Sequence, residues 1–286
     1  MAPEPKEPMS SIRSLSRRAF SETSDPEAYL PRQATENAMR EIGAWADSDD
    51  QGSTLAALIG TPGLGKTMLL RLIERRAVRT SDRPAALYLP YAGLAPQDLC
   101  LWVYGLLGEP LSAEQVADSA AAFDRLLEIG EAENPFFLLL DDADSIPAET
   151  IEGLLERVPA DHSPLRLLLA LNPDSKATRL LSLLHPLSPA TFTLRERMSD
   201  EEVLEYLRGR MRWAGFPQAE INAIDEEEAR RLNALAAGIP RQLHRLALFR
   251  FDDSDAALSP DLIDKQMRED WMGRPLEDEP EDELED

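Results

Sequence analysis

Short apolar runs alternate with longer segments of helical periodicity between residues 55 and 198. Apolar runs bounded by turn-forming residues predict β-strands at residues 55–59, 85–89, 136–140, 167–171 and 191–194. Apolar positions at helical spacing predict helices at residues 66–78, 96–107, 112–129 and 148–157. Strands that alternate with helices in this way form parallel sheets covered by helices. We therefore expect an α/β domain over residues 24–198.

The pattern changes after residue 198, where the apolar positions keep only helical spacing. Segments that open with capping residues or proline predict helices at residues 199–213, 225–237, 240–250 and 259–271. We expect them to form a small all-helical domain over residues 199–272. Residues 1–23 and 273–286 show no periodicity and are rich in proline and charge, so we expect both ends to be disordered.

The charge of the chain is strongly negative. Its 286 residues include 53 acidic and 30 basic side chains, which give a net charge of −23. The tail at 277–286 holds only eight of the carboxylates, so the folded body is acidic as well. A negative field repels phosphate backbones and anionic lipid, and it therefore disfavours binding to nucleic acid or to a membrane surface.

The cellular setting follows from what the sequence contains. Cys100 is the only cysteine and lies in an apolar segment, which excludes an internal disulfide and predicts a buried thiol. Apolar runs stay shorter than the about 18 to 20 residues of a membrane span. The arginines near the N-terminus are not followed by the apolar segment of a secretory signal. We expect a cytoplasmic protein without a transmembrane segment.

One segment carries a specific chemical signature. The pattern G-x-x-x-x-G-K-[ST] is matched at every position by Gly60, Thr61, Pro62, Gly63, Leu64, Gly65, Lys66 and Thr67, and Met68 follows. A strand precedes the pattern and a helix follows it, so backbone amides at the helix N-terminus can surround phosphates. Lys66 is expected to reach the β- and γ-phosphates, and the Thr67 hydroxyl to bind Mg²⁺. The segment therefore predicts a nucleotide site.

Two acidic residues follow the apolar run at 136–140. Asp141 is the expected carboxylate on the metal side, acting through water, and Asp142 is the expected base that polarises the attacking water. Glutamate is common at the second position; aspartate is one methylene shorter, which could slow hydrolysis. In isolation the pair could equally form a solvated loop with a helix cap at Asp144.

Two further polar residues complete the candidate site. Asn172 ends a predicted strand, where open α/β sheets place their ligands, and its amide can hold the attacking water; an ordinary Asn-Pro turn is the alternative. Arg241 closes the segment 238–241 and lies in the first turn of a predicted helix, where a positive side chain opposes the helix dipole. Pairing with a phosphate would explain this position, and a solvated arginine is the alternative.

The ordered set of residues 60–67, 138–142, 172 and 238–241 resembles the Walker A, Walker B, sensor 1 and sensor 2 motifs of AAA+ ATPases. Residues 25–30, 172–174 and 199–215 are similar to segments of the general secretion pathway component A group (ExeA-like), which is grouped with ORC-type and transposition ATPases. The resemblance covers about residues 20 to 250, and the P-loop is its one highly specific part.

This resemblance implies a five-stranded parallel sheet with a helical lid, ATP at their junction, and Arg241 reaching the γ-phosphate from the lid. It also implies a ring or filament in which a neighbouring subunit supplies an arginine. Residues 180–193, where related proteins place that arginine, contain none. Nearby substitutes are Arg179, Arg195 and Arg197.

The leading interpretation is an Mg²⁺-dependent ATPase that hydrolyses ATP, with Asp142, Asn172 and Arg241 as catalytic residues, and changes the conformation of a protein partner. The alternative is an ATP-gated interaction module with slow or no hydrolysis, which Asp142 and the missing arginine favour. A third interpretation, DNA targeting of the transposition type, conflicts with the acidic charge.

Overall fold

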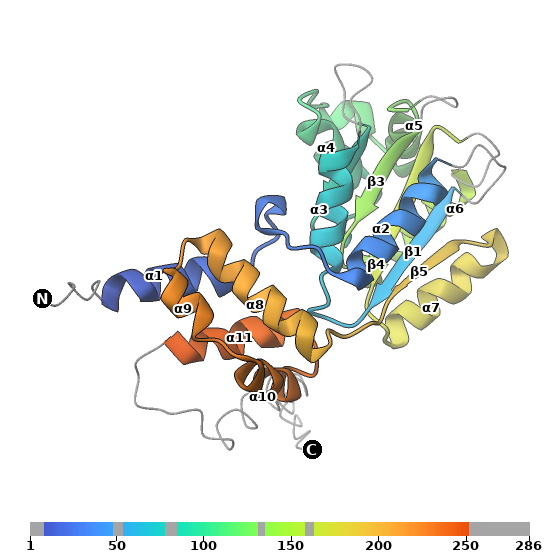
Figure 1. Cartoon of the computed structure of the whole chain (residues 1–286). Helices are drawn as coiled ribbons and strands as arrows, with labels where there is room; N and C mark the ends of the chain where they lie inside the picture. The colour runs from blue at the N-terminus through green and yellow to red at the C-terminus, as the bar shows by residue number, and fades with distance from the viewer. Residues whose placement is uncertain (1–8, 48–53, 78–84, 131–134, 158–162, 252–286) are drawn as a thin grey trace, which may run out of the picture.

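The structure is a computed structural model that describes residues 9–47, 54–77, 85–130, 135–157 and 163–251. Five parallel strands form one sheet in the order β2-β3-β4-β1-β5 (Figure 1). They are β1 Leu55–Gly60, β2 Ala86–Leu89, β3 Phe136–Leu140, β4 Leu165–Leu171 and β5 Ala190–Leu194. The strands predicted from the apolar runs are therefore confirmed, and only their ends differ.

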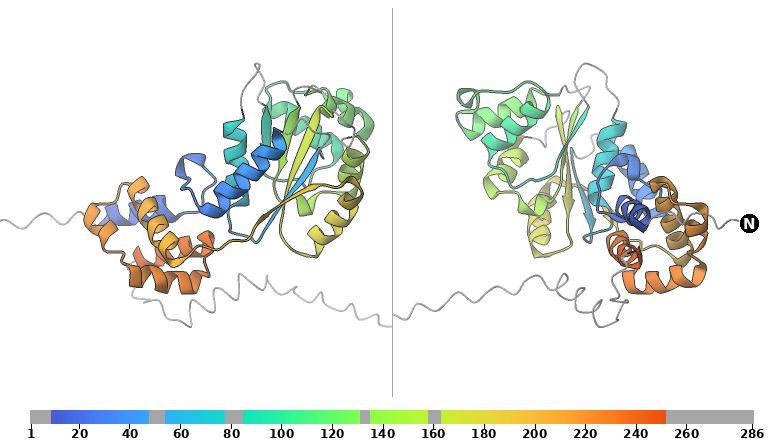
Figure 2. Two further views of the ribbon diagram at one scale, coloured as in Figure 1. Left: turned by 45° about the vertical axis from the view of Figure 1, so that its right-hand side comes forward. Right: turned by 90° about the vertical axis from the view of Figure 1, so that its left-hand side faces the viewer.

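Alternate residues of each strand face opposite sides of the sheet, which creates a hydrophobic core on each face. In β1, Leu55 and Ala57 pack on one face, whereas Ala56 and Leu58 pack on the other. The first face is covered by α4 Pro96–Leu106, α5 Ser119–Leu127, α6 Ala148–Arg157 and α7 Ser175–Leu184. The second face is covered by α2 Gln33–Ala46 and α3 Lys66–Arg76 (Figure 2). Burial on both faces explains the nearly continuous apolar sequence of the strands.

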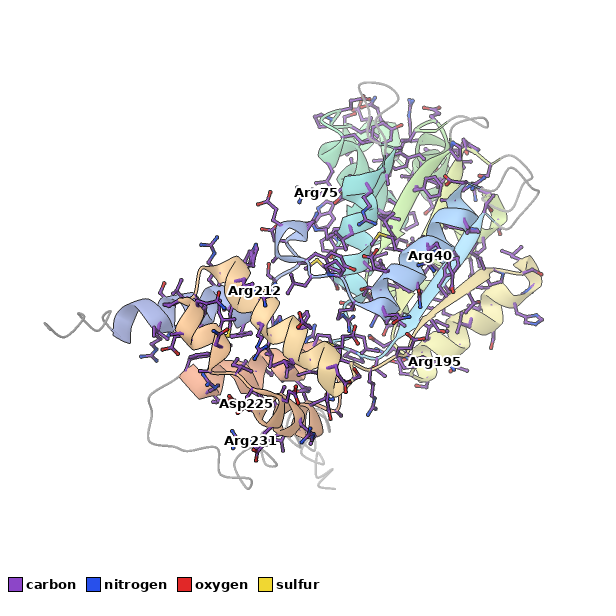
Figure 3. All side chains as sticks on the ribbon, viewed as in Figure 1. Arg40, Arg75, Arg195, Arg212, Asp225 and Arg231 are labelled. Carbon is purple, nitrogen blue, oxygen red and sulfur yellow. The ribbon has the colours of Figure 1, made fainter. Side chains whose placement is uncertain are left out.

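The helices that follow the sheet form a lid, as expected. In the described chain they are α8 Asp200–Ala214, α9 Gln218–Asn222, α10 Glu226–Ala236 and α11 Pro240–Phe251. Ser199 caps α8, and Asp225, labelled in Figure 3, caps α10; each accepts a hydrogen bond from a backbone amide of the first turn. The lid has a hydrophobic core of its own. The predicted helix at 259–271 and the acidic tail at 273–286 lie outside the described residues.

The N-terminal segment corrects the prediction of disorder over residues 1–23. Met9–Phe20 forms helix α1, which packs against α8 and α11 of the lid. Ala19 and Phe20 are buried there, and the Phe20 ring centroid lies 5.9 Å from that of His244 and 6.1 Å from that of Phe251. Disorder is therefore the wrong prediction for residues 9–20, because their few apolar side chains complete a core built by distant residues.

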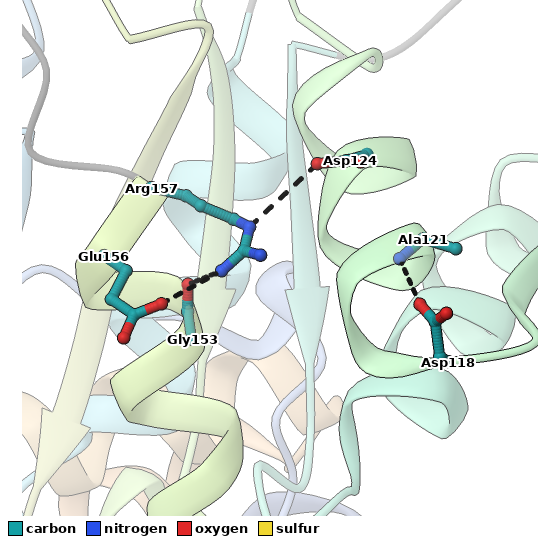
Figure 4. A network of polar contacts seen from close by, with 6 residues as sticks. All are labelled: Asp118, Ala121, Asp124, Gly153, Glu156 and Arg157. Carbon is teal, nitrogen blue, oxygen red and sulfur yellow. Dashed lines mark hydrogen bonds and ion pairs between the residues drawn. The ribbon is translucent and has the colours of Figure 1, made fainter.

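The helix expected over residues 112–129 is divided. Ser112 opens a capping box around a short 3₁₀ helix, Ala113–Val116. The Asp118 side chain then accepts a hydrogen bond from the Ala121 amide, so Asp118 is the N-cap of α5 (Figure 4). Because an N-cap residue has extended backbone angles, Asp118 cannot continue a helix through its own position. The prediction of helical residues is correct, and the prediction of one continuous helix is wrong.

Helices α5 and α6 approach closely because Gly153 has no side chain. A Cβ atom at Gly153 would lie 2.1 Å from the Phe123 ring. The Arg157 guanidinium lies over that ring, 4.9 Å from its centroid, and also contacts Asp124, Glu156 and the Gly153 carbonyl (Figure 4). Arg157 thus covers the exposed side of the contact between the two helices.

Replacing Phe20 by alanine should test whether α1 is part of the lid. The ring is 1% exposed, and removing a buried phenylalanine from a core costs about 3 to 5 kcal/mol. We expect a loss of this size in the free energy of unfolding, measured by urea denaturation with lid tryptophan fluorescence. Arg17→Ala, at an exposed position of the same helix, serves as control and should change stability little. Equal stability of Phe20→Ala and wild type would mean that α1 does not dock on the lid.

Candidate nucleotide site at the junction of sheet and lid

The P-loop connects the end of β1 to the start of α3. Gly63 and Gly65 have φ angles of 86° and 102°, in the left-handed region that glycine adopts without strain. Gly65 is the N-cap of α3, so the first amides of the helix face the loop. A Cβ atom at Gly63 would lie 2.7 Å from the Cβ of Arg241 in the lid. The glycines therefore permit both the phosphate-binding backbone and a close approach of the lid.

Lys66 is held at the centre of the site although it is only 7% exposed. Its Nζ donates hydrogen bonds to the Gly60 carbonyl at 2.7 Å and to Asn172 Oδ1 at 2.8 Å. Burial lowers the pKa of Lys66, and the nearby carboxylates, first that of Asp141, oppose this shift. Both of its partners are neutral oxygens, so a phosphate would be a stronger acceptor for the same ammonium group.

Asp141 lies at the end of β3 and faces the P-loop. The Thr67 hydroxyl donates a hydrogen bond to Asp141 Oδ2 at 2.6 Å, and the Tyr88 hydroxyl donates to the same oxygen at 3.1 Å. Tyr88 was not predicted as a site residue, because its position in a short apolar strand gives no chemical signal. Burial and the Asp141 carboxylate raise the pKa of Tyr88, which keeps this hydroxyl a donor.

The donor set fits a magnesium ion shared with phosphates. Thr67 and Asp141 offer hard oxygen ligands, which Mg²⁺ prefers. Asp144 follows Asp141 closely in the sequence, and its Oδ1 is buried without a hydrogen-bond partner. No cluster of three or more His, Cys, Asp and Glu residues in the described ranges could hold a metal alone. The arrangement therefore suits an ion that takes part of its coordination from a nucleotide.

Asp142 adopts a left-handed backbone conformation, with φ 45° and ψ 42°. Asparagine and aspartate tolerate this region better than other residues with a Cβ, but it still costs energy. The Ser145 hydroxyl donates to the Asp142 carbonyl at 2.7 Å and supports the turn. Partial burial, and then the charges of Asp141 and Asp144, raise the pKa of Asp142. A carboxylate with a raised pKa is a better proton acceptor, which suits the predicted base.

Asn172 follows β4 and links the lysine to the acidic loop. Its Oδ1 accepts from Lys66, and its Nδ2 donates to Asp144 Oδ2 at 3.3 Å. The Asn172 carbonyl also accepts from the Asp174 amide at 2.9 Å, so the residue forms a turn as well. Asn172 therefore lies in the candidate site and also forms the turn that was considered as the alternative.

Arg241 brings the lid to the P-loop. Its backbone amide donates to the Gly63 carbonyl at 3.3 Å. Its side chain is 42% exposed, and Nε lies 3.4 Å from Glu22 Oε2. Glu22 also pairs with Arg245 at 3.4 Å. Glu22 was missed because it lies in the segment predicted to be disordered.

A third missed residue is Arg32, the N-cap of α2, which is 6% exposed. Its Nη2 donates to the carbonyl of Leu64 in the P-loop at 2.5 Å, and its Nη1 is buried without a partner. Burial lowers the pKa of Arg32. An arginine just before a predicted helix resembles a solvated residue in the sequence; only the fold places it against the loop.

These groups surround one pocket of about 550 Å³. Loop residues 62–68, Asp141, Asp142, Asn172 and Arg241 all line it. The same pocket is also lined by residues that precede or begin α2 and by residues of the lid, among them Glu22, Ala28, Tyr29, Leu30, Arg32, Tyr206, Arg210 and His244. The volume is within the range of small-molecule sites. The residues predicted from sequence, apart from Gly60 and Thr61, thus share one pocket with residues of the lid.

Known proteins match this arrangement. The AAA domain family matches residues 49–181. A Walker-type ATPase of Pyrococcus abyssi superposes with a TM-score of 0.59 at 16% sequence identity, over 86% of this chain and 77% of the other. A search among curated proteins gives no match. Separately, the described residues include no helix that is long and apolar enough to cross a membrane.

Two further solved structures share the fold. The structure of Drosophila ORC bound to DNA superposes with a TM-score of 0.56 at 18% identity, over 96% of this chain and 70% of that one. Cdc6p from Pyrobaculum aerophilum gives a TM-score of 0.58 at 19% identity, over 81% of this chain but only 63% of its own. Together with the AAA match, they support an AAA+ P-loop ATPase with the fold of the ORC and Cdc6 group.

Proposed function

We propose that this protein binds Mg²⁺-ATP between its sheet and its lid and hydrolyses it. The observation that carries the proposal is the convergence of Lys66 on Asn172 and of Thr67 on Asp141, with Arg241 against the same loop. In the part of the chain that the structure describes, these groups share a single pocket. They supply a phosphate cradle, a metal-side carboxylate and a polar group at the end of a central strand.

Each residue has a distinct chemical role in this proposal. Thr67 and Asp141 would hold the magnesium ion, which supplies positive charge to the phosphates when bound. Lys66 neutralises charge on the β- and γ-phosphates and stabilises the charge that develops on them. Asn172 orients the attacking water, and Asp142 accepts its proton. Arg241 contributes a positive charge from the lid.

The output of the reaction is a change in the position of the lid. Arg241 can distinguish ATP from ADP because only ATP offers a γ-phosphate. We therefore propose two units, residues 24–198 and 199–272, with α1 added to the second. A protein partner or further copies of the chain in a ring or filament would sense the movement. Cytoplasmic location stays part of the proposal.

A switch with slow hydrolysis is the second candidate, and Asp142 is the observation that favours it. The side chain is one methylene shorter than that of glutamate. The strained backbone also fixes the position of the Cβ atom from which the carboxylate extends. If the carboxylate does not reach the water, ATP stays bound and its presence is the signal. Tight binding with little phosphate release would select this candidate.

We propose protein rather than nucleic acid as the partner, and the net charge of −23 supports this choice. The Drosophila ORC structure contains DNA, so the alternative is tested directly. Retention of DNA at low salt with a steep salt dependence would contradict our choice, because contacts to phosphates release counterions.

Lys66→Ala should abolish nucleotide binding and keep the fold. The substitution removes the ammonium that faces the phosphates, while the strand and helix on either side remain. Calorimetry with Mg²⁺-ATP measures binding, and phosphate release at several protein concentrations measures turnover. Lys176→Ala, at an exposed position of α7, is the matched control and should behave like wild type. ATP binding by Lys66→Ala with wild-type affinity would refute the assignment of the loop.

Asp142→Asn should stabilise the nucleotide-free protein at neutral pH. The pKa of Asp142 is raised above its ordinary 3.8 in the folded state, so its ionised form opposes folding. Asparagine removes this charge and tolerates the same backbone angles. The gain should shrink as the pH falls through the raised pKa, because Asp142 then becomes neutral as well. Urea unfolding of both proteins from about pH 8 to about pH 3.5, below the ordinary pKa of an aspartate, measures this, and a constant difference over that range would contradict it.

Arg241→Ala should narrow the ratio of ATP to ADP affinity. A charge-assisted hydrogen bond to the γ-phosphate is worth about 1.5 to 3 kcal/mol, or roughly ten- to a hundredfold in affinity. ADP binding should barely change. Titrating both nucleotides by calorimetry measures the ratio, and equal losses for both would place Arg241 near the shared phosphates instead.

The same titration with Glu22→Gln supplies the reciprocal control. The Glu22 carboxylate holds Arg241 in the nucleotide-free structure, so its removal should strengthen ATP binding. The pair is exposed, which limits the gain to about 1 kcal/mol or roughly fivefold. In an Arg241→Ala background the gain should disappear.

A further inference from the structure

Arg210 of α8 is a buried arginine that the proposed chemistry does not use. It is 1% exposed. Its Nε donates to the Ala19 carbonyl at 2.6 Å, and its Nη1 donates to the Ala28 carbonyl. Its Nη2 is buried and has no hydrogen-bond partner. Two N–H groups thus fix the orientation of the guanidinium, and the third nitrogen is left unused.

The surroundings of Arg210 do not neutralise its charge. In the described ranges, no carboxylate lies within ion-pair distance of it. Its Cζ lies 4.8 Å from the centroid of the Trp213 ring, which stabilises the cation only in part. Burial lowers the pKa of Arg210. A buried charged group with an unused donor is costly, so an acceptor from outside the chain would be favourable here.

Arg210 lines the same pocket as the P-loop. Ala28, Tyr29, Leu30 and His244 line it as well. His244 Nε2 is paired with the Tyr206 hydroxyl at 2.9 Å, and burial holds the pKa of His244 at about 3, so the ring is neutral. Among the described pocket residues, only Arg32 and Arg210 carry a buried nitrogen without a partner. Arg32 is already engaged with the P-loop through the Leu64 carbonyl.

A nucleotide whose phosphates lie on the P-loop must place its base in the remainder of this pocket. Most of the lid side chains that line this pocket are apolar or already paired, so Arg210 Nη2 is the buried donor of the lid that a base would meet without a competing partner. A purine offers ring nitrogens with lone pairs as acceptors. A guanidinium hydrogen bond to such an acceptor is charge-assisted and therefore stronger than a neutral one.

We propose that Arg210 recognises the purine base, donating a hydrogen bond from Nη2 to a ring nitrogen of the bound nucleotide. The inference rests on the proposed function, since it requires phosphates on the P-loop. The two carbonyl contacts hold the donor in place before the ligand arrives, which reduces the entropy lost on binding. The contact with Ala19 also joins the base-binding group to helix α1.

Nucleotide analogues test this on the wild-type protein, without any change to the fold. The 1-deaza, 3-deaza and 7-deaza forms of ATP each replace one ring nitrogen by C–H and keep the phosphates. Calorimetry at a fixed Mg²⁺ concentration should show one analogue binding roughly ten- to a hundredfold more weakly than ATP, the scale of a charge-assisted hydrogen bond. Equal affinities for ATP and all three analogues would overturn the proposal.

Arg210→Met then assigns the lost contact to this side chain. We expect the variant to bind ATP as weakly as wild type binds the affected analogue, and to bind that analogue no more weakly than ATP. Arg208→Met is the matched control, because Arg208 donates only to the Ile224 carbonyl and lies outside the pocket lining. If Arg210→Met still discriminates against the analogue, another group recognises the base and the proposal is overturned.

A replacement variant and two binding outcomes complete the test. If Arg210→Met fails to fold by circular dichroism, Arg210→Lys replaces it under the same criterion, because lysine keeps the charge but cannot hold two carbonyls and present a third donor. If wild type binds neither ATP nor any analogue, the proposed function fails together with this inference. Tight ATP binding without discrimination among the analogues overturns the inference alone.

Discussion

The site depends on keeping one charged ammonium group almost buried at the carboxyl end of a parallel sheet. Lys66 can stay there because the strand order surrounds it with oxygens. Strand β4 lies beside β1 and is followed by Asn172, and β3 lies beside β4 and is followed by Asp141. Burial lowers the pKa of the lysine, and the carboxylates oppose the shift. The order of the strands in the sheet, more than any single residue, therefore places these polar groups beside the P-loop.

The lid approaches this centre through backbone contacts and a weak ion pair. Gly63 leaves room for Arg241, and Gly238, with φ 70°, leaves room for the chain around Met198, which its carbonyl contacts at 3.2 Å. A side chain at Gly63 would keep the lid from approaching the loop, and one at Gly238 would collide with the chain at Arg197 and Met198. The contact between Arg241 and Glu22 is exposed and therefore easily exchanged. A phosphate can take the place of the carboxylate without breaking any core packing.

The sequence predicts what is encoded locally and misses what depends on distant contacts. The P-loop is recognisable because one short segment contains its turn, its lysine and its hydroxyl; the strands are recognisable because both of their faces are apolar. Helix α1 is missed because its core partners follow some 190 residues later, as the contact from Arg210 to Ala19, 191 residues apart, illustrates. Arg32 and Glu22 are missed for the same reason. The division at Asp118 could have been anticipated, since aspartate is a strong N-cap.

The concentration of cations in the pocket explains how so acidic a chain can accept an anionic ligand. Arg32, Lys66, Arg210 and Arg241 line the pocket together with only three carboxylates, those of Glu22, Asp141 and Asp142, although the whole chain carries −23. Three of the four cations are nearly buried. Two of those, Arg32 and Arg210, have no carboxylate within ion-pair distance in the described ranges and keep an unused nitrogen. Uncompensated buried charge lowers stability, and a ligand that compensates it stabilises the folded state by mass action. The same uncompensated positive charge therefore lowers the stability of the junction between sheet and lid and favours the binding of an anionic ligand.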